Sequence, residues 1–141
     1  MTAEIILDEN PSKEDLKVIY SGLLQFNSDA YGAPENKQVV FLLRDSDSHE
    51  TVGGLHAIWV YGWLYVTMLF IPVELRLQGL GRKLLAEAEA FARSQNSTGM
   101  WVDTFSFQAP GFYVRAGFEK FGELPNFPDG HSRIFYRKLL T

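Results

Sequence analysis

The amino-acid sequence predicts a mixed α/β fold with a mainly antiparallel sheet and flanking helices. Two apolar runs, Thr51–Val60 and Trp63–Phe70, flank the dipeptide Tyr61-Gly62 as the arms of a β-hairpin would. A helical pattern that begins at Gly79 separates this hairpin from another strand, and two further strands close the chain. Hairpins combined with helical crossovers are typical of a mixed sheet and argue against a doubly wound sheet or a sandwich.

The N-terminal part of the chain predicts one strand and one helix. Ala3–Asp8 is a short apolar segment and a candidate first strand. A helix is expected to start within Pro11–Asp15, because Ser12 can cap it and acidic side chains suit its positive end. Apolar residues then recur at helical spacing and give this helix a face for a core. Asn27–Lys37 is expected to form a loop or a short helix.

The middle of the chain predicts three strands and then a long helix. Gln38–Arg44 is a nearly continuous apolar run, which is typical of a buried strand, and Asp45–Glu50 is a polar turn. The hairpin follows, and its second arm is expected to end at Pro72. From Gly79 the apolar residues recur at helical spacing, and this pattern stops within Gln95–Gly99.

The C-terminal part predicts a short helix between strands. Met100–Phe105 is expected to be a strand. Pro110–Ala116 is expected to be a helix, with its proline in the first turn and Gly117 as its stop. The closing strands and the loop between them are expected at Phe118–Leu124, Ser132–Leu139 and Pro125–Gly130.

The composition is that of a globular domain and excludes several kinds of site. The chain has 141 residues, 46% of them hydrophobic, and 13 basic against 17 acidic residues give a net charge of −4. This length is in the range of one domain, so we expect a single domain over residues 1–141. The absence of cysteine excludes a disulfide framework and a cysteine nucleophile. No metal site is expected, because Gly53 stands where the zinc pattern that begins at His49 needs its second histidine.

Charge and hydropathy predict where the protein acts. The first residues lack the basic and apolar regions of a signal peptide, and the longest apolar stretch, near Ala57–Val73, is broken by Gly62. We therefore expect a cytoplasmic protein that does not associate with a membrane. The mild acidic balance argues against bulk binding of nucleic acid.

The segment Met68–Leu85 carries the clearest chemical signal. A strand is followed by a loop with Gly79 and Gly81 and then at once by an amphipathic helix. Glycines let the backbone approach a ligand, and the first N–H groups of a helix have no internal partner, so this arrangement favours binding of phosphate oxygens. Three cations lie within eight residues that hold no acid: Arg76, Arg82 and Lys83.

The spacing of this segment discriminates between phosphate-binding loops. No glycine in it is followed by lysine, which excludes a P-loop, and the preceding hairpin does not suit a dinucleotide-binding βαβ unit. The pattern R-x-x-G-x-G at residues 76–81 instead resembles the acyl-CoA pyrophosphate loop of the GNAT N-acetyltransferase superfamily. A second block, A-x-x-F-Y-x-x-x-G-F at residues 109–118, is similar to a later motif of that family. Two departures are Leu77, where the family often has glycine, and Thr104 and Ser106, where it often has asparagine.

The resemblance implies a GNAT-like acyl-CoA N-acyltransferase fold that uses acetyl-CoA as acyl donor. The diphosphate would lie on the backbone N–H groups of Leu77–Arg82, and the pantetheine arm would pair with a strand edge where the family splays two central strands apart. The expected cofactor-binding residues are Leu69, Ile71, Arg76, Leu77, Gln78, Gly79, Leu80, Gly81 and Arg82.

The resemblance also implies the catalytic residues. Tyr113 matches the family tyrosine that protonates the departing thiolate, although a phenol with a pKa of ~10 gives its proton to a thiolate with a pKa of ~8.5 only at a cost of roughly 2 kcal/mol. The attacking amine needs a proton acceptor, for which Glu74 ranks ahead of His56, Asp103 and His131. Direct transfer is expected, because the chain has no cysteine and no G-x-S-x-G nucleophile motif.

The acceptor is expected to be a primary amine of a small molecule or peptide. By analogy with the family it would bind between two loops, at Tyr31, Glu35, Phe127, Asp129 and His131. A homodimer is common in the family, and the aromatic residues of the hairpin offer a face for one. Two alternatives stay open: an acyl-CoA-binding regulatory or sensor module with little catalysis, and a binder of another nucleotide such as ATP or NAD.

Overall fold

The computed structural model describes residues 1–141, and its internal contacts divide the chain into two units, Met1–Pro34 and Glu35–Thr141. The first unit contains one helix, α1 (Lys13–Ala30). The Asp15 backbone N–H donates to Ser12 Oγ at 3.1 Å, which confirms the predicted cap. The strand predicted at Ala3–Asp8 is wrong, because a strand needs a partner and no other extended segment pairs with it.

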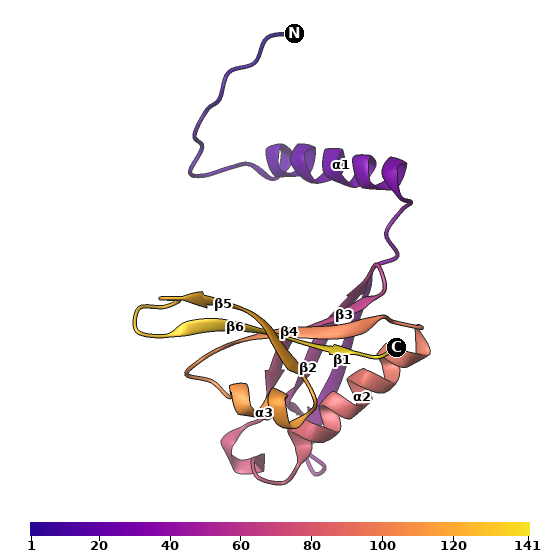
Figure 1. The fold of residues 1–141 in the computed structure, drawn as a ribbon, viewed down its shortest axis with the longest axis vertical. Coiled ribbons are helices and arrows are strands. Elements are labelled where there is room, and N and C mark those ends of the chain that lie inside the picture. Colours follow the sequence, from indigo (N-terminus) through magenta and orange to yellow (C-terminus); the bar gives the residue numbers. More distant parts are fainter. The chain divides into compact units, whose positions relative to one another are not determined.

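The second unit holds every strand of the protein (Figure 1). The predicted elements from residue 38 onward are all present, with ends shifted by about one residue. They are β1 (Lys37–Arg44), β2 (Thr51–Val60), β3 (Trp63–Phe70), α2 (Leu80–Ser94), β4 (Gly99–Phe105), α3 (Pro110–Arg115), β5 (Glu119–Pro125) and β6 (Ser132–Leu139). The structure adds a short 3₁₀ helix that was not predicted, η1 (Val73–Leu75).

The six strands form one sheet in the order β1-β2-β3-β4-β6-β5. Four of the neighbouring pairs are antiparallel, and β3 with β4 is the one parallel pair. These two strands are joined through α2, as a parallel pair requires a crossover connection. The sheet confirms the predicted mixed, mainly antiparallel fold.

The β2–β3 hairpin turns at the predicted dipeptide. Val60 pairs with Trp63, and Tyr61 and Gly62 have φ values of 48° and 82°. Positive φ at both central residues is the geometry of the two-residue turn that matches the twist of a hairpin. The register of this hairpin shifts between His56 and Ala57, and such a bulge bends its strands.

The core lies between the sheet and α2. The helix buries its apolar stripe against the alternate residues of the strands, and each of these side chains is at most 6% exposed. The members from α2 and the central strands are Leu55, Ala57, Leu64, Val66, Leu84, Leu85, Ala88, Ala92, Met100 and Val102. This packing fixes the first turn of α2 near the end of β3, to which residues 71–79 connect it in the chain.

Two expectations about hydropathy can be compared with the structure. β1 is an edge strand in which half-buried side chains alternate with exposed ones, so the apolar run Gln38–Arg44 is a strand but not a fully buried one. None of the helices combines the length and the hydropathy that crossing a membrane requires.

Candidate functional site

The two central strands part half-way along their length. β3 and β4 pair in parallel from Trp63 with Gly99 to Val66 with Val102, and their remaining residues do not pair with each other. This confirms the predicted splay of these strands. It leaves strand-edge N–H and C=O groups facing an open wedge, where an amide-containing ligand can pair as an added strand.

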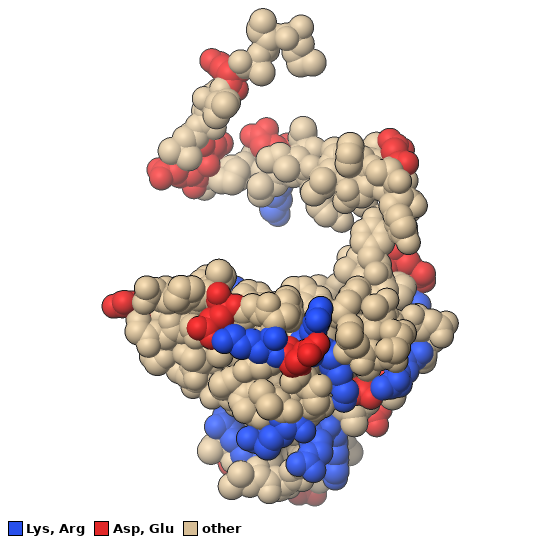
Figure 2. Space-filling model, in the orientation of Figure 1, with Lys and Arg blue, Asp and Glu red and all other residues tan.

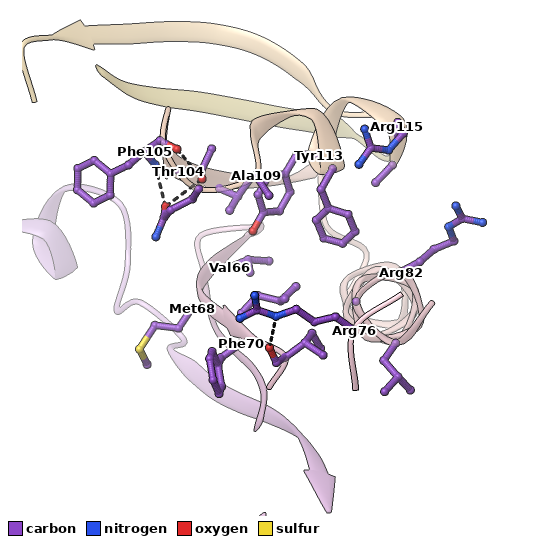
Figure 3. A pocket seen from close by; sticks show the side chains of 18 of the residues that line it. Val66, Met68, Phe70, Arg76, Arg82, Thr104, Phe105, Ala109, Tyr113 and Arg115 are labelled. Carbon is purple, nitrogen blue, oxygen red and sulfur yellow. Dashed lines mark hydrogen bonds between the residues drawn. The ribbon is translucent and has the colours of Figure 1, made fainter. Parts of the chain in front are cut away.

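A cleft of about 950 Å³ occupies this wedge (Figure 3). Its walls are the parted halves of β3 and β4, the turn before α2, and α3. The predicted site residues that line it are Leu69, Ile71, Arg76, Leu77, Gly79, Leu80, Gly81, Arg82 and Tyr113. Gln78 and Glu74 were also predicted, but neither belongs to the lining, and Glu74 lies exposed in η1.

The turn before α2 presents a row of unpaired donors. The backbone N–H groups of residues 77 to 82 donate to no acceptor within the protein, and the first helical bond of α2 runs from Lys83 N to Gly79 O at 3.1 Å. Gly79 begins the helix with φ of 78°, in the left-handed region that favours glycine. The helix dipole adds positive potential at the same end, so the turn can hold an anion.

Leu77 stands where the family pattern often has a glycine, and the structure shows its backbone conformation. Its φ is 63°, a left-handed conformation that costs roughly 1–2 kcal/mol in a residue with a Cβ. A glycine at this position would adopt that conformation freely. The backbone of the turn therefore keeps the shape that the family's glycine suits, although the side chain differs.

Gly81 is where α2 meets α3. A Cβ built on Gly81 would lie 3.2 Å from Cζ of Phe112, closer than ordinary contact. The absence of a side chain thus lets the α3 ring rest against the first turn of α2. The same absence leaves the neighbouring N–H groups open to a ligand.

Basic side chains are concentrated around the N-terminus of α2. Figure 2 shows Lys and Arg side chains concentrated over the part of residues 35–141 where α2 begins and α3 lies. Arg82 and Arg115 both line the cleft and point toward the same side of it in Figure 3. Arg76 has a different place, because its Nε donates to the Ile71 carbonyl at 2.9 Å and thereby braces the loop between β3 and α2.

Tyr113 lies between the two ends of the cleft. The residue is 8% exposed, and its ring packs against Phe112, Phe118 and Tyr136. Figure 3 shows its hydroxyl pointing into the cleft. Burial, and then the negative charge of Asp103, raise the pKa of Tyr113 to about 12. The phenol therefore stays protonated at neutral pH and can donate a hydrogen bond to a ligand in the cleft.

This pKa predicts a pH dependence of stability. The folded protein holds the Tyr113 proton at pH values where the unfolded chain, with an ordinary tyrosine pKa of 10.0, has lost it. The resulting stability is complete below about pH 10 and falls as the pH rises toward 12, by about 2–3 kcal/mol. Urea unfolding at several pH values should show this loss in the wild type relative to Tyr113→Phe. A difference between the two proteins that does not change from pH 9 to pH 12 would contradict it.

Asp103 stands where the strands part. It is the first residue of β4 beyond the last pair with β3, and it lines the cleft. Tyr65 Oη donates to its Oδ2 at 2.6 Å, and Arg133 approaches its Oδ1 at 2.7 Å. Burial, and then the hydrogen bond to this carboxylate, raise the pKa of Tyr65. Both carboxylate oxygens are thus engaged.

The other predicted acid–base candidates lie elsewhere. The His56 ring is held between Thr67 Oγ1 and Gln38 Oε1 on β1–β3. His131 Nδ1 lies 3.3 Å from Ser106 Oγ, which also accepts from the Ser132 N–H at 3.0 Å. Ser106 thus joins β4 to β6 through a hydroxyl.

The predicted acceptor-site residues are distributed over both units. Tyr31 belongs to the first unit, and Glu35 begins the second, where it pairs with Lys37 at 3.4 Å. In the β5–β6 loop, the Phe127 ring contacts Phe105 and the His131 ring contacts Phe107. Asp129 lies exposed in the same loop.

The cleft has more lining residues than were predicted, and three of the additional ones bear on its chemistry: Phe105, Phe107 and Arg115. Each has a local signal in the sequence, because Arg115 lies inside the second motif block and the two phenylalanines lie within the four residues before it. The sequence alone does not show that these three side chains face the cleft.

The sequence model of the acetyltransferase (GNAT) domain matches residues 36–120. The chain belongs to the GNAT acetyltransferase family. It is 35% identical over 133 residues to acetyltransferase Atu2258 of Agrobacterium fabrum, covering 94% of this chain and 96% of that protein. It is 42% identical over 82 residues to the blasticidin-S acetyltransferase of Streptomyces morookaense, covering 57% and 60% of the two chains.

Comparison with a solved structure supports the same family assignment. A crystal structure assigned to an acetyltransferase of Agrobacterium tumefaciens is 33% identical, with a TM-score of 0.89, and the match covers 97% of this chain and 99% of that one. As a member of the GNAT family the protein is an acyltransferase, with the mixed, mainly antiparallel sheet that the family's motifs predict.

Proposed function

We propose that this chain transfers an acetyl group from acetyl-CoA directly to a primary amine of a small molecule or peptide. The observation that carries the proposal is the row of unpaired N–H groups at residues 77–82, beside a cleft that opens between two parted strands. Unpaired N–H groups in the turn before a helix and in its first turn suit a diphosphate, and the strand edge of β3 suits the amides of a pantetheine arm.

Different residues of the cleft have different roles in the proposed reaction. Acetyl-CoA, when bound, supplies an activated thioester. The turn at residues 77–82 holds the diphosphate, and Tyr113 donates a hydrogen bond to the leaving sulfur. With a pKa of about 12, complete transfer of the Tyr113 proton to a thiolate is uphill by about 5 kcal/mol, so hydrogen bonding is its contribution.

The proton acceptor for the amine stays a prediction. Glu74 lies in η1 and outside the cleft lining, whereas Asp103 lies within it. Position therefore favours Asp103 over Glu74 as the proton acceptor. Because both oxygens of Asp103 are engaged, however, we infer that Asp103 holds the site and that the amine proton passes to water.

The acceptor class has one line of support outside the cleft. The Streptomyces relative acetylates blasticidin-S, as its name states, which favours a small-molecule acceptor for this chain also. A single domain over residues 1–141, a cytoplasmic location and a homodimer are proposed on the sequence arguments alone.

Thiol release from acetyl-CoA in a panel of amines tests the proposal. We expect release that depends on the amine and a matching acetylated amine in the mass spectrum. Tight binding of coenzyme A without release in any amine would favour the sensor module instead. A larger rise in melting temperature with ATP or NAD than with acetyl-CoA would favour another nucleotide ligand.

Arg82 and Arg115 should strengthen binding of the anionic donor. Each contributes a charge-assisted contact at the rim of the cleft, so Arg82→Ala or Arg115→Ala should raise the dissociation constant for coenzyme A about 5- to 10-fold at low salt. The effect should shrink at high salt because these side chains are exposed. Calorimetry at two salt concentrations measures both, with Arg44→Ala, outside the cleft lining, as control. Affinities like the wild type's in both variants would contradict the prediction.

A further inference from the structure

A cluster of aromatic rings closes one end of the cleft. The rings of Phe105 and Phe107 stack with centroids 5.2 Å apart and planes inclined by 7°. Phe127, from the β5–β6 loop, lies 5.5 Å from Phe105, and His131 meets Phe107 edge-on at 5.2 Å. This cluster joins the end of β4 to the β5–β6 loop.

The cluster and the cationic turn lie at opposite ends of the cleft. Phe105 and Phe107 line the cleft. In Figure 3 the Phe105 ring is on the side away from Arg82 and Arg115, and the Tyr113 hydroxyl lies between them. A donor whose diphosphate is held at the turn and whose sulfur is at Tyr113 leaves the aromatic end for the acceptor.

The charges next to Phe105 and Phe127, those of Arg133 and Asp103, are paired with each other. The Arg133 guanidinium lies 5.8 Å from the Phe105 centroid and 5.4 Å from the Phe127 centroid, so the chain's own cation takes the cation–π positions of these rings. The same guanidinium pairs with Asp103 at 2.7 Å. A second cation would therefore find little attraction here, and a neutral group is preferred.

Phe107 exposes a large part of its surface to solvent. The residue is 55% exposed although Phe105 and His131 both contact its ring. An exposed aromatic ring beside a second stacked ring offers a planar partner both apolar area and favourable ring–ring geometry.

We propose that Phe105, Phe107 and Phe127 form an acceptor subsite for amines that carry an aromatic or heteroaromatic ring. The inference rests on the proposed acetyl transfer, because the position of the donor defines the acceptor end of the cleft. Phe107 determines the specificity of this subsite, and Arg133 keeps its charge balanced.

Two amines of matched shape test the subsite. Benzylamine and cyclohexylmethylamine differ mainly in whether their ring is planar and aromatic, and the ratio of their kcat/KM values is measured for the wild type, Phe107→Leu and Phe121→Leu. Phe121 is a control because it is similarly exposed, at 51%, but lies on β5 outside the cleft lining. The comparison between variants cancels the intrinsic reactivity of the amines.

We expect Phe107→Leu to lower the benzylamine preference roughly 3- to 10-fold and Phe121→Leu to leave it unchanged. An equal ratio in all three proteins would overturn the inference, and so would a Phe107→Leu variant that loses affinity for coenzyme A instead. Calorimetric binding of both amines in the presence of coenzyme A gives the same comparison without turnover. Failure of the proposed function has a different signature, since no amine of either kind would then release thiol from acetyl-CoA in the wild type, whether or not coenzyme A binds.

Discussion

Gly81→Val is expected to raise the dissociation constant for coenzyme A about 100-fold or more. A side chain at this position would cover the neighbouring N–H groups of the turn and would meet Cζ of Phe112, which lies only 3.2 Å from the position of its Cβ. Each charge-assisted hydrogen bond lost is worth about 1.5–3 kcal/mol, so two lost bonds account for this factor. Isothermal titration calorimetry measures the affinity directly.

Two further variants separate the possible reasons for this loss. Gly81→Val combined with Phe112→Leu gives the new side chain room against α3, and it should still bind coenzyme A weakly because the N–H groups remain covered. Glu87→Val places the same β-branched residue at an exposed position nearly two turns further along α2 and should bind like the wild type. Wild-type affinity in Gly81→Val would contradict the assignment of this turn.

Tyr113 should have two separable roles, one in the fold and one in turnover. Tyr113→Ala is expected to destabilise the protein by about 3–5 kcal/mol, because the ring packs against Phe112, Phe118 and Tyr136 in the core. Tyr113→Phe keeps the ring and removes only the hydroxyl. It should lower kcat by roughly 10- to 100-fold while the dissociation constant for acetyl-CoA stays near that of the wild type.

Denaturant unfolding and steady-state kinetics on these two variants check both roles. A Tyr113→Phe enzyme with unchanged kcat would remove the hydroxyl from the reaction. A Tyr113→Phe protein as unstable as Tyr113→Ala would instead show that the hydroxyl, and not the ring, supports the fold.

The cofactor turn could be predicted because its determinants are local. The glycines at 79 and 81, the arginine at 76 and the helical pattern that follows all lie within one short segment. A helix N-terminus leaves its first N–H groups unpaired wherever it occurs, so the spacing alone predicts where donors will face a ligand. The hairpin and its turn were predictable for the same reason.

The remaining features depend on contacts between distant residues. Ala3–Asp8 has the composition of a strand, but pairing decides whether an extended segment joins a sheet. Glu74 directly follows the predicted cofactor strand in sequence, yet η1 carries it outside the cleft lining. The Asp103–Arg133 pair and the Phe105–Phe127 contact join β4 to β6 and to the β5–β6 loop, and no single segment reveals them.

The central claim is that the backbone N–H groups of residues 77–82 bind the diphosphate of coenzyme A. A ¹H–¹⁵N NMR titration with coenzyme A tests it at the atoms concerned. We predict that the amide signals of these six residues shift strongly and saturate together. Saturable shifts elsewhere in the chain with these six signals unmoved, or no shifts at all, would contradict the claim.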